Sequence, residues 1–332
     1  TAGGVEFQVG QNGEMLPMPE PTEVQEDEHN IDLTNVLDES TLKTISNELV
    51  GAFEEDKESR DEWLTIFSDG LDLLGIKSEE RTMPFPGACG VTHPLLAEAA
   101  TQFQAQAYKE LLPANGPVNT KIVGAESPET MAQCQRVKEF MNYQITEVME
   151  EYDPDMDSLL FYLPLAGSAF KKVYFDSLLG RATSAFVKAE DLVVSYDTTN
   201  LETSQRISHI LNMTGNDIRK MQINGIYRDI EIGSPGEVSL DEAKDKMDEL
   251  QGLSKPTSDY DEYTLLELHV NLELDDIDQY DYAVPYIVTI LEDSGEILSI
   301  RRNWEQGDEL FRKKEYFIHY KFLPGLGFYG FG

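Results

Sequence analysis

The residues that could carry chemistry are five histidines, two cysteines and a large excess of carboxylates. Cys89 and Cys134 form neither a disulfide framework nor a metal-ligand pattern. The sequence contains no HExxH, GxSxG, CxxC or P-loop lysine motif. A shared metal site would require the fold to gather distant histidines, so structural histidines are the simpler interpretation; the five are His29, His93, His209, His269 and His319. We therefore expect no catalytic residue, no metal and no cofactor.

The acidic stretch at residues 275–281 is the alternative centre for chemistry. It holds four aspartates within seven residues, which could bind Mg²⁺ in a metal-dependent enzyme acting on nucleic acid. An EF-hand loop needs Gly at its sixth position and Glu at its twelfth. Counted from Asp276, these positions are Asp281 and Ile287, so the calcium pattern fails. A solvated acidic loop is the other interpretation.

A glycine pattern near the C-terminus resembles a dinucleotide-binding turn. Residues 325–330 read Gly-Leu-Gly-Phe-Tyr-Gly and follow a strand-like stretch at 315–322. A nicotinamide site also needs a helix at the last glycine and an acidic residue about 20 positions later. The sequence given ends at Gly332, before either could appear. We expect a hinge instead, in which Pro324, Gly325, Gly327 and Gly330 set the entry into an element beyond Gly332.

The charge of the chain limits its partners. The 332 residues include 62 acidic and 26 basic ones, a net charge of −36. So large an excess of acidic residues argues against a basic surface that binds nucleic acid. It suits a protein that repels polyanions or functions in high salt. The first 40 residues hold ten acidic residues and no Lys or Arg, the opposite of a signal peptide. No apolar run approaches the roughly 18 residues of a membrane span, so no membrane partner is expected.

The first half of the chain shows helical periodicity. Residues 1–38 predict a flexible acidic arm, either solvated or docked on a neighbouring subunit. Residues 39–165 form a helical part, with segments beginning at Ser40, His93-Pro94 and Ser127-Pro128 and one through residues 63–74. In the helix that begins at Ser127-Pro128, one apolar stripe is expected to face the core. The stripe comprises Met131, Cys134, Val137, Met141, Ile145 and Val148.

Residues 166–322 change to the alternation of strands. Two hairpins are predicted, 169–175 with 183–187 around Gly180 and 284–291 with 297–303. Further strands are expected at 192–196, 206–213, 263–274 and 315–322, with a short helix from Thr214 to Gly225 and a charged helical insertion at 239–252. Residues 323–332 are the expected hinge. Helices followed by strands predict an α+β fold with a mostly antiparallel sheet region.

Positive charge is concentrated at Lys171, Lys172, Arg301 and Arg302, which fall in two predicted strands. Two interpretations stay open for these four residues. They are either contacts between subunits, pairing with an acidic neighbour, or ordinary solvated strand positions.

Several ordered blocks together resemble the portal proteins of tailed bacteriophages, most closely the podovirus type. The blocks are residues 90–96 leading into 102–112, residues 167–176, residues 186–197 and residues 322–332, within a similarity that spans roughly 40–332. The resemblance implies a portal wing, with 323–332 leading to a stem helix not present in this sequence. It also implies a structural protein rather than an enzyme.

The resemblance further implies a homo-oligomeric ring, usually of twelve copies, at one vertex of the virion capsid. Such a ring is assembled in the host bacterial cytoplasm and contacts the major capsid protein. It docks the large subunit of terminase and then head-completion or tail adaptor proteins. Double-stranded DNA passes through it without sequence-specific binding. A net-acidic ring would not hold DNA phosphates tightly, although a high-salt host would select the same charge.

Overall fold

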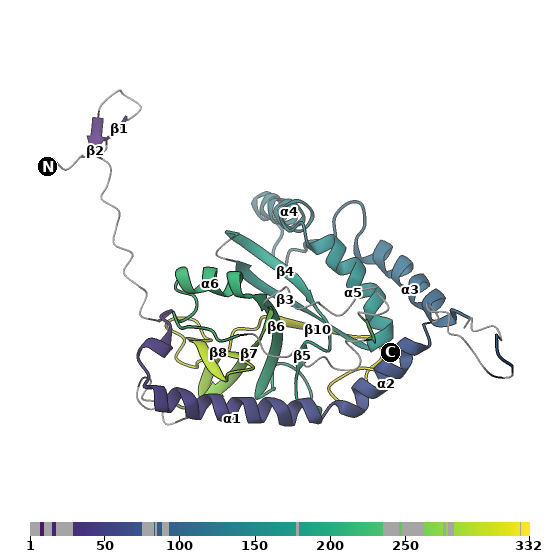
Figure 1. Ribbon diagram of the computed structural model, residues 1–332. Coiled ribbons are helices and arrows are strands. Elements are labelled where there is room, and N and C mark those ends of the chain that lie inside the picture. The colour runs from purple at the N-terminus through teal and green to yellow at the C-terminus, as the bar shows by residue number, and fades with distance from the viewer. Residues whose placement is uncertain are drawn as a thin grey trace. The chain divides into compact units, whose positions relative to one another are not determined.

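The computed structural model describes residues 7–9, 15–17, 29–74, 83, 85–87, 93–176, 179–234, 246–247, 262–274, 277, 282–325 and 327–332. The chain divides into two units, Thr1–Ile31 and Asp32–Gly332. In the first unit, strands β1 (Phe7–Val9) and β2 (Met15–Pro17) form an antiparallel pair. All the other elements belong to the second unit (Figure 1).

Two antiparallel sheets form the centre of the second unit. The larger has the order β5 (Leu192–Val193), β6 (Arg206–Thr214), β7 (Glu262–Leu272), β8 (Val284–Leu291) and β9 (Glu296–Arg302). The smaller has the order β10 (Phe317–Lys321), β3 (Ser168–Asp176) and β4 (Arg181–Val187). The predicted mixture of helices and antiparallel sheet is therefore confirmed.

Local turn chemistry explains both predicted hairpins. Gly180 between β3 and β4 has φ +65°, and Gly295 between β8 and β9 has φ +67°. Residues that carry a Cβ rarely adopt this left-handed backbone conformation, so glycine is the residue that closes each turn. The short helix α6 (Gly215–Ile223) begins as predicted, with the Thr214 side chain accepting from the Asp217 N–H.

Helices cover the sheets from several directions. The 3₁₀ turn η1 (Leu33–Asn35) and the long helix α1 (Glu39–Glu58) lie against the five-stranded sheet. Helix α5 (Tyr152–Ala166) packs on β3 and β4, and in turn contacts α2 (Asp61–Asp72) and α3 (Leu95–Leu111). Figure 1 shows α1 running along the lower side of the five-stranded sheet and α3 beside α5.

The N-terminal boundary differs from the prediction. Asp38, rather than Ser40, caps α1 by accepting from the Thr41 N–H. Leu33 is fully buried, and the Asp32 carboxylate accepts from the N–H groups of Thr34 and Ile300. Residues 32–38 thus belong to the folded body and not to the acidic arm.

Helix α4 (Pro128–Tyr143) contradicts the expected burial of its apolar stripe. Ser127 caps it as predicted, with a reciprocal bond from Thr130, but no residue of the helix is buried. It continues into the π-helix η2 (Gln144–Val148). Cys134 is half-buried and bonds Thr120, so it is not the small core residue that was expected. Of the predicted stripe, Cys134, Ile145 and Val148 are only partly buried, and Met131, Val137 and Met141 remain exposed.

The sequence did not single out α5, which is one of the most buried helices. It ends at Gly167, whose φ is +76°. Its side chains join those of α2, β3 and the C-terminal segment in the main core; they are Met156, Leu159, Leu160, Tyr162, Leu163 and Ala166. Burial on many sides removes the one-sided pattern by which an amphipathic helix is recognised.

Two predicted features lie almost entirely outside the described residues. The charged insertion at 239–252 lies outside the described residues except for 246–247. The aspartates of 275–281 likewise lie outside them, where only Ile277 is described.

Candidate functional site

The C-terminal segment folds back on the body of the protein. The Phe322 N–H donates to the Gly167 carbonyl at 2.9 Å. Leu323 and Phe331 then form an isolated bridge, with N–O distances of 3.2 and 2.9 Å. Residues 323–331 therefore make a closed loop seated at the end of α5.

Two aromatic side chains anchor this loop. Phe328 and Tyr329 are 0% and 1% exposed. The Phe328 ring stacks on Phe170 of β3, with 6.0 Å between centroids, and its N–H donates to the Tyr196 carbonyl at 3.0 Å. The Tyr329 ring stacks on Trp63 of α2 with 4.5 Å between centroids. The loop thereby joins α2, β3 and the segment after β5.

The predicted hinge glycines lie in this loop for a reason that differs from the predicted one. None of Gly325, Gly327 and Gly330 has a positive φ. A Cβ on Gly330 would lie 2.4 Å from the Gly167 carbonyl oxygen, and one on Gly327 would lie 2.3 Å from the Tyr196 ring. Close approach, not backbone freedom, requires glycine here. Pro324 is exposed at the loop surface.

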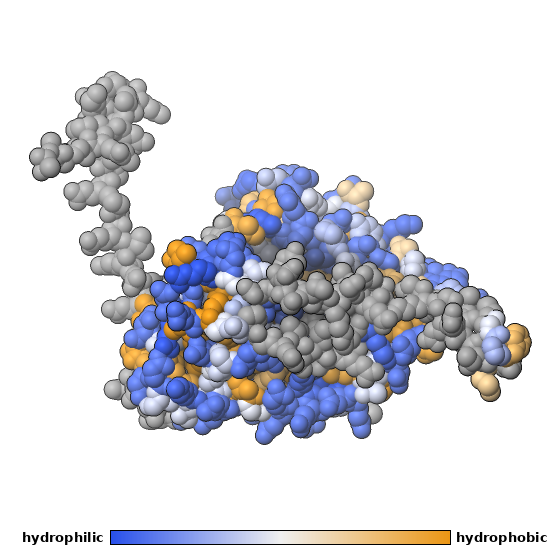
Figure 2. All heavy atoms as spheres, viewed as in Figure 1, coloured by the Kyte–Doolittle hydropathy of each residue, from blue (hydrophilic) through white to orange (hydrophobic). Residues whose placement is uncertain are grey.

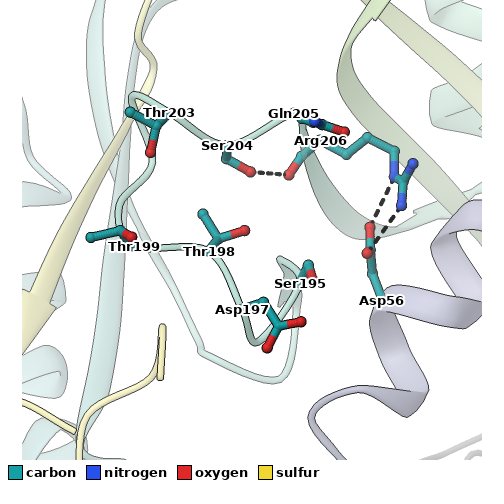
Figure 3. Close-up of a pocket in the computed structure, with 9 residues that line it drawn as sticks. All are labelled: Asp56, Ser195, Asp197, Thr198, Thr199, Thr203, Ser204, Gln205 and Arg206. Carbon is teal, nitrogen blue, oxygen red and sulfur yellow. Dashed lines mark hydrogen bonds and ion pairs between the residues drawn. The ribbon is translucent and has the colours of Figure 1, made fainter. Parts of the chain in front are cut away.

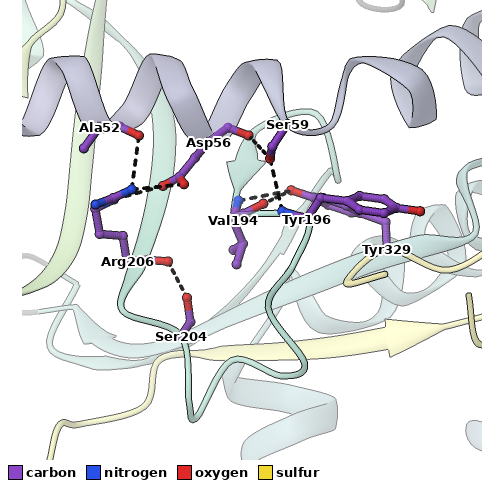
Figure 4. Close-up of polar contacts among 8 residues, drawn as sticks. All are labelled: Ala52, Asp56, Ser59, Val194, Tyr196, Ser204, Arg206 and Tyr329. Atoms are coloured by element: carbon purple, nitrogen blue, oxygen red, sulfur yellow. Dashed lines mark hydrogen bonds and ion pairs between the residues drawn. The ribbon is translucent and has the colours of Figure 1, made fainter. Parts of the chain in front are cut away.

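Arg60 and the Tyr329 hydroxyl meet beneath the loop. The Arg60 side chain, 0% exposed, donates from Nη1 to the carbonyls of Ala189 and Leu192 at 2.8 and 3.1 Å, and from Nη2 to that of Glu190 at 2.6 Å. The Tyr329 hydroxyl accepts from Nη1 at 3.3 Å. It also accepts from the Val194 N–H at 3.1 Å (Figure 4). The sequence did not identify Arg60 as a buried residue, because an arginine among charged residues at a helix end is usually exposed to solvent.

A polar cleft of about 330 Å³ opens next to this junction, between α1 and the loop that precedes β6 (Figure 3). Hydroxyl and carboxyl side chains line most of it. Its cation, Arg206, donates to both Asp56 carboxylate oxygens at 2.9 and 3.1 Å (Figure 4). Because Asp56 neutralises Arg206 and Asp197 adds a further carboxylate, the cleft does not suit a phosphate group.

The four predicted basic positions lie in different environments. Lys171 is 1% exposed, and its Nζ lies 4.0 Å from the centroid of the Tyr152 ring, without a hydrogen-bond partner among the described residues. Burial lowers the pKa of Lys171, and the nearby Asp155 and Glu151 oppose that shift. Arg301 donates to the carbonyls of Gly225 and Ile226 at 3.1 and 3.0 Å, while Arg302 is half-buried on β9.

Lys172 pairs within the chain. Its Nζ lies 2.6 and 2.7 Å from the two carboxylate oxygens of Glu267 on β7. His269 Nε2 lies 2.9 Å from the same carboxylate, and the cluster borders a cleft of about 790 Å³ between β3–β4 and β6–β7. Burial opposes the charge of Glu267, yet Lys172 and His269 hold its pKa well below its usual range. The carboxylate is therefore committed to these two partners and is a poor general base.

The strand histidines do not share a metal site. His209 on β6 lies opposite Glu267, and His269 lies two residues from Glu267 on the same strand, β7. His319 instead stacks on Phe170 and lies 3.0 Å from the Ser168 hydroxyl. Within the described ranges, no group of three or more His, Cys, Asp or Glu side chains could hold a metal ion. The aspartates of 275–281 fall outside those ranges.

We expect His209 to make the fold sensitive to acid. Burial, reinforced by the charge of Lys172, lowers the pKa of His209 to about 3 from 6.5. Between these two values the unfolded chain binds a proton that the folded one excludes. Stability should therefore fall as pH is lowered through this window, by up to about 1.4 kcal/mol per pH unit. His209→Gln should reduce this slope in denaturant titrations between pH 4 and 7.

His93→Gln is the matched control, because the His93 side chain is exposed and lies outside the cleft. The prediction fails if His209→Gln and His93→Gln leave the same pH dependence as the unaltered chain.

Comparison of the sequence with known protein families and with curated proteins finds no match. In the part of the chain that the structure describes, no helix combines the length and the apolar character that crossing a membrane requires.

Proposed function

We propose that this chain is the wing portion of a portal subunit of a tailed bacteriophage and assembles into a ring at one capsid vertex. The observation that carries the proposal is spatial. The blocks whose sequence resembles portal proteins lie far apart in the chain, yet they meet at the C-terminal loop. A shared site of contact gives a physical reason for these blocks to occur together.

Three contacts join the blocks. Phe103, from the block that forms α3, packs edge-to-face on Phe322 with 5.1 Å between ring centroids. Gly167, which opens the β3 block, accepts from the Phe322 N–H, and Tyr196, which lies near the end of the β4–β5 block, accepts from the Phe328 N–H. The proposal places the stem helix after Gly332, at which point residues 331 and 332 are exposed.

The proposed role is structural rather than enzymatic. The ionisable groups of the large cleft are engaged with one another, as Lys172 and Glu267 show, so they support packing better than catalysis. The net charge of −36 would reduce the friction of DNA in a ring, because few phosphates could be neutralised. In this proposal, terminase supplies the work of packaging, and tail adaptor proteins and the capsid bind the same ring in the virion.

The test is the assembly state of the purified full-length protein, measured by native mass spectrometry and by electron microscopy with rotational class averaging. The proposal expects rings with a central channel and about twelvefold symmetry, as the resemblance implies. Monodisperse particles without rotational symmetry, over a wide range of salt and protein concentration, would refute it. A nuclease assay with Mg²⁺ or Mn²⁺ on the same sample tests the alternative at residues 275–281.

A further inference from the structure

Helix α4 exposes an apolar surface that the described residues of its own chain do not cover. Val137, Phe140 and Met141 are 52%, 59% and 41% exposed. They lie at positions i, i+3 and i+4, which places them side by side on one face. Arg136 and Lys138 flank this row. We call these five residues the α4 face; Figure 2 shows hydrophobic side chains at the surface over α4.

A helix of this kind needs a partner. The internal contacts of α4 reach mainly η2 and the segment before Ser127, through Cys134 with Thr120 and Asn142 with Val118. Isolated helices of about 12–15 residues are marginal in water, and most helical stability comes from packing an apolar face. α4 has 16 residues and none is buried. Burying the α4 face on another molecule would supply the missing packing.

The charges indicate what that molecule is. Residues 93–148 hold four basic and six acidic residues, a net charge of −2 in a chain of −36. None of the four basic residues forms an ion pair within the described ranges; they are Lys109, Lys121, Arg136 and Lys138. Basic residues elsewhere do pair internally, as Lys172, Arg181 and Arg206 do. This region thus offers unpaired cations to an acidic partner.

The edge of the small sheet is a poor competitor for that role. β4 is an edge strand, and an open edge invites pairing with another chain. Here the Glu151 carboxylate accepts from the Ser184 N–H at 3.2 Å, and the Asp155 carboxylate accepts from the Phe186 N–H at 2.6 Å. These side chains occupy the donors that strand addition would use.

We propose that the α4 face docks on an acidic surface of a second copy of this chain. Two copies that each carry −36 repel one another, so they associate best where one of them presents apolar and unpaired basic groups. A basic partner would instead prefer the acidic remainder of the surface. This contact rests on the proposed function, because a ring requires two different surfaces of neighbouring copies to meet. The α4 face would be one of these two surfaces.

The experiment compares three full-length proteins by native mass spectrometry and electron microscopy: the unaltered chain, the double variant Val137→Asp and Phe140→Asp, and the control Ile223→Asp. Ile223 on α6 is 73% exposed, so the control loses an exposed apolar side chain and gains the same charge. Far-ultraviolet circular dichroism and thermal unfolding check that all three remain folded. Because the replaced side chains are exposed, stability should change little.

The expected result is that the double variant weakens association between copies by about 100-fold or more while the control assembles as before. Rings in all three proteins would overturn the α4 inference and leave the portal proposal intact. Small oligomers of the unaltered chain that only the double variant disperses would support the α4 contact and reject the ring. An unaltered chain that stays monomeric at every concentration would reject both.

Discussion

Replacing Arg60 with alanine is expected to lower the free energy of unfolding by about 3 to 5 kcal/mol, one of the largest effects available in this protein. The guanidinium is fully buried and satisfies the carbonyls of Ala189, Glu190 and Leu192. Its removal takes the guanidinium donors from the Ala189 and Glu190 carbonyls in a site that water does not reach, while the Leu192 carbonyl keeps the bond from the Tyr329 hydroxyl at 3.0 Å. It also leaves a cavity beside the Tyr329 ring. Urea denaturation followed by tryptophan fluorescence would measure the loss, because Trp63 lies on that ring.

Two further variants make the Arg60 prediction specific. Arg60→Lys keeps the charge but lacks the planar fork, so it should recover only part of the loss. Arg219→Ala removes an arginine whose pair with Asp229 is exposed, with side-chain exposures of 55% and 74%, and should cost less than about 1 kcal/mol. Equal losses for Arg60→Ala and Arg219→Ala would contradict the structural role of Arg60.

Gly330→Ala is expected to destabilise the fold by about 3 kcal/mol and to release the C-terminal loop. A Cβ at this position would lie 2.4 Å from the Gly167 carbonyl oxygen and 2.7 Å from that of Leu323. Both contacts are to backbone, so a change of rotamer cannot relieve them. The displaced loop would lose the bond from the Gly330 N–H to the Ser168 hydroxyl and the bond from Trp63 Nε1 to the Gly330 carbonyl.

Two other glycines give the comparison. Gly327→Ala meets the Tyr196 ring at 2.3 Å, but a side chain can move, so its loss should be smaller than that of Gly330→Ala. Gly51 lies inside α1 with nothing within 4 Å of a built Cβ, so Gly51→Ala should stabilise the protein by about 1 kcal/mol. Hydrogen exchange of the amides at residues 328–331 would report loop release. An order of stabilities that does not follow these contacts would show that close packing is not the reason for the glycines.

Arg60 and Gly330 both hold the C-terminal loop on the body of the protein, and under the proposed function this attachment would also affect the ring. The C-terminal loop would connect the wing to the stem, so a loop held by Arg60 and by the Gly167–Gly330 contact would fix the direction in which the stem leaves. Variants that loosen the loop without unfolding the body should then give rings of irregular diameter. The expectation applies only if the protein forms a ring.

The sequence alone predicted the elements whose signals are local. Ser127 and Thr214 cap helices as expected, and Gly180 and Gly295 close the predicted hairpins. These features depend on residues within a few positions of one another, since a cap bonds an N–H three residues ahead and a turn glycine responds to its own φ. The α+β class follows from the same local periodicities.

The tertiary structure decided which apolar surfaces are buried and what the charged residues do. α4 carries the clearer stripe and remains exposed, whereas α5, with a weaker pattern, enters the core. Neighbouring lysines diverge as well, because Lys172 faces Glu267 across the sheets while Lys171 faces Tyr152. Arg60 is bound by carbonyls about 130 positions away, and Gly330 is constrained by Gly167. Such roles arise from contacts between distant segments, whose partners no local pattern in the sequence identifies.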